Sequence, residues 1–356
     1  MDLSLQRIDA ALSTLKPKIR GEVIHIAGTN GKGSTALFIA NILQAEGFSV
    51  ALFTSPHIIS IYERLQYNSG FISPEEFDEL FSNCKDIIIE NKLTYFESLF
   101  ALFMLYSSRK DPDFLVLETG LGGRFDATNT NYIKKKYPVI TQISLDHGEI
   151  LGENIYGILS EKLAVIKDNS PVFAGLCKDF IMNKINSIPA EVISPSQADI
   201  LHALQYAPPP FNSNLALAQT TVKYICKRDI AYKSYPLPPC RQERFGRIIL
   251  DGAHNAAGIL TLKKRFPKIG GALISSTKER NIKRFIHILS SCTRNIIATS
   301  IPDNQRSIDG IGLGGIRFIE EPIDALNELD KRSVGDILVT GSLYLCSFIR
   351  KLLLDR

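Results

Sequence analysis

A strand, a glycine-rich loop and a helix follow one another near the start of the chain, and this order constrains the fold most strongly. Residues 23–27 form a short, mainly apolar run that reads as a buried strand, and the stretch GTNGKGST at 28–35 comes directly after it. Apolar residues then recur at helical spacing as far as Gly47, which suits the position after a helix end. Glycines leave room for backbone N–H groups to surround phosphate oxygens, and the following helix adds its dipole. The order therefore predicts a phosphate-binding loop.

The loop departs from the usual phosphate-loop pattern, G-x-x-x-x-G-K-[ST]. Only two residues separate Gly28 from Gly31, and Gly33 stands between Lys32 and Ser34. A tight turn without a ligand is the alternative interpretation. The position of the glycines between a strand and a helix, together with a lysine and a hydroxyl, favours a specialised phosphate loop.

The rest of the chain repeats short apolar runs, each followed by a turn and a helical pattern. Continuous apolarity is typical of strands covered on both faces, which predicts an α/β fold with largely parallel sheet. A chain of 356 residues exceeds one ordinary core, and a proline-rich stretch at 236–239 suits a linker. We therefore expect two domains, 1–237 and 238–356. The further predicted strands are 50–53, 114–117, 139–144, 172–174, 248–250, 272–274, 296–298 and 337–339.

Composition is that of an ordinary globular protein, with 45% hydrophobic and 22% charged residues and a net charge of +4. The basic runs 134–136 and 263–265 are more typical of solvated faces than of nucleic-acid patches. The six cysteines have neither C-x-x-C nor zinc spacing. Residues 1–20 are mixed and polar, so we expect no secretory signal there, and no apolar stretch reaches the ~20 residues that span a bilayer. We expect a monomeric cytoplasmic protein that binds neither nucleic acid nor membrane.

Ionisable side chains follow two of the predicted strands. Glu118 follows the run 114–117, and Asp146 and His147 follow the run 139–144. A carboxylate at a strand tip beside a phosphate loop is well placed to bind Mg²⁺, although it could instead cap a turn. His147 alone would more often be a structural histidine. Their shared edge of the sheet predicts an ATP and Mg²⁺ site.

Several motifs together resemble one family. HIAGTNGKGST, LETGLGGRFDATN, SLDHGEILG, LDGAHN and VTGSLYL, in this order, resemble the folylpolyglutamate synthase and dihydrofolate synthase family, which is related to the Mur peptide ligases. The similarity runs from about residue 4 to 350, and the GTNGKGS form of the loop distinguishes this branch from the Mur enzymes. The resemblance implies a P-loop Mur-ligase-like ATPase domain and a smaller C-terminal Rossmann-like domain.

The chemistry that the resemblance implies is an ATP-dependent amide ligation. A carboxylate attacks the γ-phosphate of ATP to give an acyl phosphate, and the amino group of L-glutamate then displaces phosphate. The bacterial bifunctional type would act on dihydropteroate and on reduced folates, with ATP and one or two Mg²⁺ ions. A monofunctional folylpolyglutamate synthase and a Mur-type peptide ligase remain alternatives. A non-catalytic ATP-binding protein is disfavoured, because such a module has no need of the metal residues.

The resemblance also implies roles for particular residues. Lys32, His147 and Lys162 would be catalytic, and Lys162 matches a lysine that is carbamylated in relatives. Metal ligands would be Ser55, Glu118 and His147. Nucleotide contacts would come from Gly31, Lys32, Gly33, Ser34, Asn214, Arg241 and Asp251. The pterin would contact Thr94, Tyr95, Phe96, Glu97, Phe125, Asp126 and Ala127.

Three positions depart from the family pattern. Leu163 and Ala164 replace an Ala-Gly pair after Lys162, Cys240 replaces the glycine before Arg241, and Pro210-Phe211 stands where a His-Gln pair is usual. Phe96 and Phe125 could form the apolar walls of a pocket for a flat heterocycle, or they could be core residues.

Overall fold

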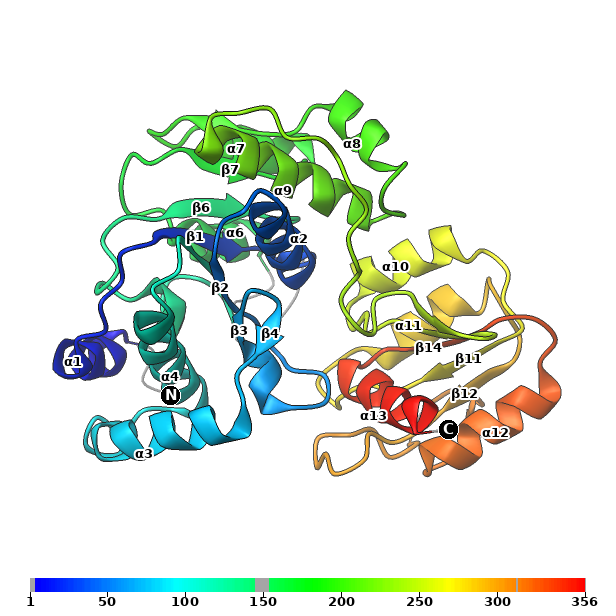
Figure 1. The fold of residues 1–356 in the computed structure, drawn as a ribbon. Coiled ribbons are helices and arrows are strands. Elements are labelled where there is room, and N and C mark those ends of the chain that lie inside the picture. The colour runs from blue at the N-terminus through cyan, green and yellow to red at the C-terminus, as the bar shows by residue number, and fades with distance from the viewer. Residues whose placement is uncertain (1–3, 145–153, 312, 356) are drawn as a thin grey trace. The chain divides into compact units, whose positions relative to one another are not determined.

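The structure is a computed structural model that describes residues 4–144, 154–311 and 313–355. The chain divides into two compact units, Met1–Pro236 and Leu237–Arg356, and each has its own sheet (Figure 1). The sequence places the boundary between residues 237 and 238. The structure divides the chain one residue earlier, within the same proline-rich segment.

The first unit contains an eight-stranded sheet in the order β4-β3-β2-β5-β1-β6-β7-β8. The strands from β2 to β8 in this order run parallel, whereas β3 and β4 add an antiparallel edge. The strands are β1 (Glu22–Ala27), β2 (Val50–Phe53), β3 (Leu65–Tyr67), β4 (Gly70–Phe71), β5 (Phe114–Glu118), β6 (Tyr137–Ile140), β7 (Val172–Ala174) and β8 (Val192–Ile193).

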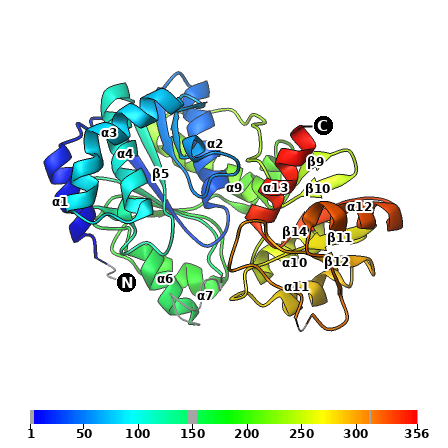
Figure 2. The ribbon, with the colours of Figure 1, turned by 90° about the horizontal axis from the view of Figure 1, so that it is seen from below.

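Helices cover both faces of this sheet. Figure 2 shows α3 and α4 on one side of β5, and α2 with α9 on the other. The helices are α1 (Gln6–Leu15), α2 (Lys32–Ala45), α3 (Pro74–Glu90), α4 (Tyr95–Lys110), α6 (Ile155–Leu163), α7 (Asp179–Asn186), α8 (Gln197–Ala203) and α9 (Phe211–Cys226). Two short 3₁₀ helices are η1 (Ile61–Arg64) and η2 (Ala127–Asn129).

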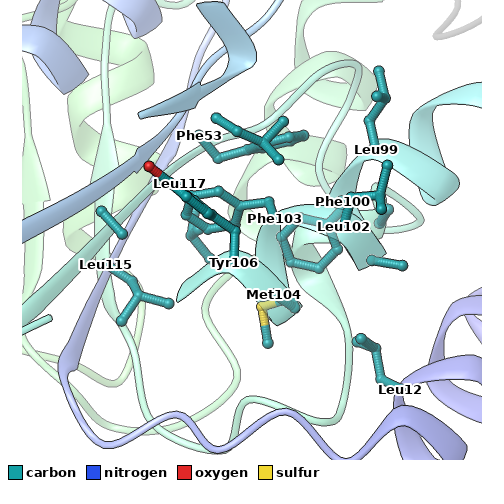
Figure 3. Packing of buried hydrophobic residues seen from close by; sticks show 14 of the residues in the cluster. Leu12, Phe53, Leu99, Phe100, Leu102, Phe103, Met104, Tyr106, Leu115 and Leu117 are labelled. Carbon is teal, nitrogen blue, oxygen red and sulfur yellow. The ribbon is translucent and has the colours of Figure 1, made fainter. Parts of the chain in front are cut away.

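The core between α4 and the sheet is rich in phenylalanine. Phe53 of β2 packs edge-on against Phe100 of α4, with ring centroids 5.4 Å apart. Phe103, one helical turn further along α4, lies 5.2 Å from the same ring (Figure 3). Leu115 and Leu117 of β5 belong to the same buried cluster. β2 and β5, the two strands that lead to the candidate site, are therefore anchored in this buried core.

The boundaries of α2 follow the predicted signals. The helix begins after Gly31, and the Glu46 N–H donates to the carbonyls of Ile42 and Leu43 at its end. Gly47 then takes the left-handed conformation, with φ of 89°. A side chain would be strained there, so the expected glycine stop is confirmed.

The second unit is a six-stranded sheet in the order β13-β12-β11-β14-β10-β9. All of its pairs are parallel except β10 with β9. The strands are β9 (Glu243–Phe245), β10 (Ile248–Leu250), β11 (Gly271–Ile274), β12 (Ile296–Ala298), β13 (Arg317–Phe318) and β14 (Ile337–Thr340). The helices are α10 (Ala256–Arg265), α11 (Ile282–Leu289), α12 (Pro322–Arg332) and α13 (Leu343–Leu354).

All nine predicted apolar runs contain a strand, and the α/β class with mainly parallel sheets is confirmed. The sequence missed β3, β4, β8, β9 and β13, which are two or three residues long and lie at or near sheet edges. Such strands need no continuous apolar run, because they are not covered on both faces. No helix in the described ranges has the length and apolar character needed to cross a bilayer.

Candidate active site

The loop after β1 adopts a shape that only glycine permits at two positions. Gly28 has φ of 152° and Gly31 has φ of 88°. A β-carbon on Gly28 would lie 1.8 Å from Thr141 Oγ1, and one on Gly31 would lie 2.4 Å from Asn214 Oδ1. The loop is therefore pressed between the segment that follows β6 and the start of α9. This places Asn214 next to the loop, and its contact with the nucleotide stays a prediction.

Hydrogen bonds from the segment after β6 fix the loop further. Thr29 Oγ1 donates to the Ser144 carbonyl at 3.0 Å, and Asn30 Nδ2 donates to Ser144 Oγ at 3.1 Å. The predicted strand 139–144 ends at Ile140 because its later residues bond to this loop: Thr29 N donates to the Gln142 carbonyl at 2.8 Å. The loop is thus held in shape by protein contacts.

Two lysines meet at the carbonyl of Gly28. Lys162 Nζ donates to this oxygen at 2.7 Å, and Lys32 Nζ donates to it at 3.2 Å. Lys162 belongs to α6 and is 5% exposed. Two ammonium groups that bond to the same oxygen repel each other. An anion bound beside them would therefore stabilise the arrangement. The structure therefore concentrates positive charge where the sequence predicts phosphates.

Glu118 lies at the first turn of α2. It ends β5 and is 4% exposed. One of its carboxylate oxygens accepts a hydrogen bond from the Ser55 N–H at 2.9 Å. A β-carbon on Gly33 would lie 3.3 Å from both carboxylate oxygens. The structure thus brings Glu118, Ser55 and the phosphate loop together.

These residues fit a divalent cation by their chemistry. Carboxylate and hydroxyl oxygens are donors that Mg²⁺ prefers. The hydroxyls of Thr35 and Thr119, which lie next to Ser34 and Glu118 in sequence, are buried and have no hydrogen-bond partner among the described residues. Buried hydroxyls without partners cost free energy, which a bound polar group would recover.

The third predicted metal ligand, His147, lies outside the described residues, as does its neighbour Asp146. Within the described ranges, no group of three or more His, Cys, Asp and Glu side chains is arranged to hold a metal ion. The predicted ligands are the Glu118 carboxylate, Ser55 and His147, and one of these three lies outside the described residues. The predicted metal site therefore stays a prediction.

Asp126 organises the loop between β5 and η2. Its Oδ2 accepts from the N–H groups of Gly120 and Leu121, at 2.8 and 2.9 Å. Its Oδ1 accepts from the Thr128 N–H at 3.0 Å and from the Thr128 hydroxyl at 2.5 Å. Burial raises the pKa of Asp126, while these hydrogen bonds lower it. This carboxylate is occupied by its own loop, and its expected contact with a pterin stays a prediction.

Asp126→Asn should lower the free energy of unfolding by about 1–3 kcal/mol, because an amide offers one acceptor oxygen where four donors converge. Urea denaturation would measure this change. Asp78→Asn, at an exposed position of α3, is the matched control and should have the same midpoint as the parent protein. Equal midpoints for all three proteins would contradict the structural role.

His25 is a residue that the sequence interpretation missed. It lies in the middle of β1, is completely buried, and its Nε2 is 2.8 Å from Thr128 Oγ1. Burial, followed by the charges of Lys136 and Lys167, lowers its pKa well below the ordinary value. The signal in the sequence was a histidine within an otherwise apolar strand. Through its contact with Thr128, His25 links the strand before the phosphate loop to the loop that Asp126 holds.

The second unit places Arg241 and Asp251 near each other. Asp251 follows β10, is 6% exposed, and accepts from the N–H groups of Gln242 and Ala253. Burial raises its pKa, and the positive charge of Arg241 opposes that shift. Cys240, which takes the place of the family's glycine, has φ of 55°. The turn thus retains a left-handed residue despite the substitution.

Comparisons with known proteins agree on one group. Residues 26–199 match the Mur ligase middle domain family. A dihydrofolate synthase/folylpolyglutamate synthase of Bacillus subtilis is 29% identical, over 98% of this chain and 93% of the relative. Over nearly its whole length, the chain is similar to the folylpolyglutamate synthases and dihydrofolate synthases.

Solved structures of this family share the fold. A folylpolyglutamate synthase of Mycobacterium tuberculosis, solved with ADP and AMPPCP, superimposes with a TM-score of 0.87 at 23% identity. The match covers 98% of this chain and 95% of that one. Escherichia coli FolC in complex with DHPP and ADP gives a TM-score of 0.86 at 23% identity, over 100% and 94% of the two chains.

The segment that this family is expected to use for the pterin begins α4. Thr94 caps the helix: the Glu97 N–H donates to Thr94 Oγ1 at 3.4 Å, and the Thr94 N–H donates to Glu97 Oε2 at 2.7 Å. Arg7 pairs with the same carboxylate at 3.3 Å. Glu97 is therefore engaged in capping its helix, and its contact with a pterin stays a prediction.

The two expected pterin segments lie against each other. A β-carbon on Gly120 would be 2.7 Å from the ring of Phe96, so this ring packs on the loop that leads to Phe125. Tyr95 is 60% exposed and Phe125 is 47% exposed, whereas Ala127 is buried. The guanidinium of Arg64 lies over the Tyr95 ring, 5.6 Å from its centroid. Both segments therefore present aromatic surface to solvent.

Proposed function

We propose that this protein is an ATP-dependent ligase that joins L-glutamate to dihydropteroate, and also to reduced folates. The observation that supports this most directly is the meeting of Lys32 and Lys162 at the Gly28 carbonyl, beside a glycine loop with Glu118 at its rim. Similarity to this family supplies the reaction class. The relatives and neighbours described above are named for this activity, and some were solved with ADP or DHPP.

The proposed reaction has two steps. A substrate carboxylate oxygen attacks the γ-phosphorus of ATP, and ADP leaves with the electrons of the broken P–O bond. The amino nitrogen of glutamate then attacks the resulting acyl phosphate, inorganic phosphate leaves, and the nitrogen loses a proton. Negatively charged groups crowd together in both steps, so positive charge and oriented N–H groups lower the barrier.

The residues of the loop have distinct roles in this proposal. Backbone N–H groups at Gly31, Gly33 and Ser34 bind phosphate oxygens at the start of α2, where the helix dipole favours negative charge. Lys32 supplies a mobile positive charge for the transferred phosphoryl group. Asn214 contacts the loop and fixes its outer side. Arg241 and Asp251 of the second unit would contact the nucleotide.

Ser55 and Glu118, with His147, would hold Mg²⁺. When bound, the ion neutralises phosphate charge and polarises the phosphoryl oxygens. A carbamate on Lys162 would turn a cation that repels Lys32 into an anion that attracts it. Carbamylation is part of the proposal for this reason as well as from the resemblance.

Two other functions use much of the same site. A monofunctional folylpolyglutamate synthase would accept reduced folates and refuse dihydropteroate. A Mur-type ligase would act on a cell-wall precursor. The match to a Mur ligase middle domain is compatible with all of these, because the ATP chemistry is shared. A monomeric state and a cytoplasmic location remain predictions.

The test is phosphate release that depends on L-glutamate, measured with ATP and Mg²⁺ while the acceptor is changed. We expect release with dihydropteroate and, more slowly, with tetrahydrofolate. A UDP-muramyl peptide should give no release above the background. If kcat/KM for the two pterins differs by more than about 10⁴-fold, equivalent to about 5.5 kcal/mol, the enzyme is monofunctional. Release with neither pterin would exclude the proposal.

A further inference from the structure

The loop that follows β5 packs directly against the end of α6, which carries Lys162. Gly123, in the middle of this loop, has no room for a side chain: a β-carbon there would lie 2.5 Å from the Glu161 carbonyl and 3.1 Å from Lys162 Cα. Only glycine permits backbone segments to approach this closely. Residues 119–129, which we call the acceptor loop because they include the expected pterin contacts 125–127, therefore touch the backbone of Lys162 itself.

The side chain of Asn129 joins the same two segments. It is 2% exposed, and its Nδ2 donates to the carbonyls of Arg124 and Ala164, both at 3.1 Å. Both partners are acceptors, so the amide has one possible orientation and uses both of its N–H bonds. Its Oδ1 is buried without a hydrogen-bond partner among the described residues, which costs stability. Asn129 thus links the residue before Phe125 to the second residue after Lys162.

A second bridge lies on the outer side of the acceptor loop. Arg124 Nε pairs with Glu161 Oε1 at 2.9 Å, and its Nη2 donates to Ser160 Oγ at 3.3 Å. The two charged side chains are 44% and 26% exposed, so solvent screens this pair more than it screens the buried amide. The bridge reaches α6 one and two residues before Lys162. Contacts from the acceptor loop therefore lie on both sides of this lysine in sequence.

Two other lysines hold the backbone around Asn129. Lys167 Nζ donates to the Asn129 carbonyl. The sequence predicts a solvated face for residues 134–136, and for Lys136 this is wrong: its side chain is 5% exposed, and its Nζ donates to the Thr128 carbonyl at 2.8 Å. Because the backbone on either side of its Cα is anchored, the Asn129 side chain has a fixed direction toward the end of α6.

The carbonyl that Asn129 binds at the end of α6 belongs to one of the positions that depart from the family pattern. Ala164 stands in place of a glycine, but it has φ of −66° and ψ of −6°, which any residue adopts. The last carbonyls of a helix lack partners within the helix, and Asn129 satisfies this one. The substitution therefore leaves the bond between the acceptor loop and α6 intact.

We infer that Asn129 is a positioning residue for Lys162, and that it couples the placement of the acceptor substrate to the placement of this lysine at the phosphate loop. Lys162 Nζ lies 2.7 Å from the Gly28 carbonyl, and Asn129 acts on it through the end of α6. The inference rests on the proposed function for the nature of the acceptor, a pterin that carries a carboxylate. A displacement of a catalytic group by about 1 Å can cost about 10²-fold in rate.

The first test compares Asn129→Asp with the parent protein in glutamate-dependent phosphate release with dihydropteroate. Aspartate has the same shape, but it cannot donate to either carbonyl. The value of kcat should fall by about 10–100-fold, whereas KM for ATP should change by less than about threefold, because other bonds hold the phosphate loop. A rise in KM for dihydropteroate at unchanged kcat would show that Asn129 only supports the pterin segment, and would overturn the inference.

Asn91→Asp is the matched control. The Nδ2 of Asn91 also donates to a backbone carbonyl, that of Ile87 at the end of α3, at 2.9 Å. This variant loses the same kind of donor and gains the same charge, and its kcat should equal that of the parent. If Asn129→Asp does not fold, Arg124→Gln removes the exposed bridge instead and should lower kcat by about two- to fivefold. Unchanged kcat in that variant would then overturn the inference.

A second readout needs no ligase activity. Acetic anhydride acetylates exposed lysines faster than buried ones, and mass spectrometry gives the labelling of Lys162 relative to Lys184, which is exposed on α7. Below the melting transition, this ratio should rise by about fivefold or more in Asn129→Asp and stay unchanged in Asn91→Asp. A parent protein without glutamate-dependent phosphate release would exclude the proposed function, while the labelling ratio would still decide the positioning role. An unchanged ratio in Asn129→Asp would overturn it.

Discussion

Glu118→Gln should lower the turnover of the ligase by about 10²–10³-fold, while the protein stays folded. A glutamine oxygen can still accept the hydrogen bond that the Ser55 N–H now donates at 2.9 Å, so the packing at the end of β5 is preserved. What disappears is the negative charge that would hold Mg²⁺ beside the phosphates. Loss of one preorganised electrostatic interaction costs about this much in turnover.

The measurement is the rate of glutamate-dependent phosphate release at saturating ATP, over a series of Mg²⁺ concentrations. The metal dependence should shift to higher concentration as turnover falls, since a ligand has been lost. Glu22→Gln is the matched control, because it removes the same charge from an exposed position at the other end of neighbouring β1. A variant with normal turnover, or one without a cooperative melting transition, would refute a metal-binding role.

Lys162→Ala should also reduce turnover by about 10²–10³-fold. The side chain is buried and its nitrogen is 2.7 Å from the Gly28 carbonyl, so its loss leaves Lys32 alone at this oxygen. The variant distinguishes two states of the lysine. A carbamate is an anion and should be replaced in part by added formate or acetate. An ammonium is a cation and should be replaced in part by a short alkylamine.

Rescue by carboxylates and not by amines is the result that we expect. A ¹³C signal from the native protein equilibrated with labelled bicarbonate, absent from Lys162→Ala, would give independent support. Lys184→Ala, at an exposed position of α7, should have normal activity and show neither rescue. Rescue by amines alone would show that the lysine works as an ammonium and would remove the carbamate from the mechanism.

The sequence determined the two sheets, the main strands and the position of the phosphate loop. Buried parallel strands require unbroken apolar runs, and a close approach of backbone to another group requires glycine; both requirements are local and visible in the order of residues. The position of Glu118 was also available, because it ends a strand adjacent to β1. The short edge strands could not be predicted from the sequence, because they are partly exposed and leave no continuous apolar pattern.

The tertiary structure alone decided which distant side chains meet. Lys162 reaches the Gly28 carbonyl across 134 residues of sequence, and Asn214 contacts Gly31. The three adjacent lysines 134–136 look alike as a sequence, yet one is buried and donates to the Thr128 carbonyl. His25 likewise becomes part of a polar network only when η2 packs over β1. Burial and charge proximity depend on how elements pack, and no local pattern specifies them.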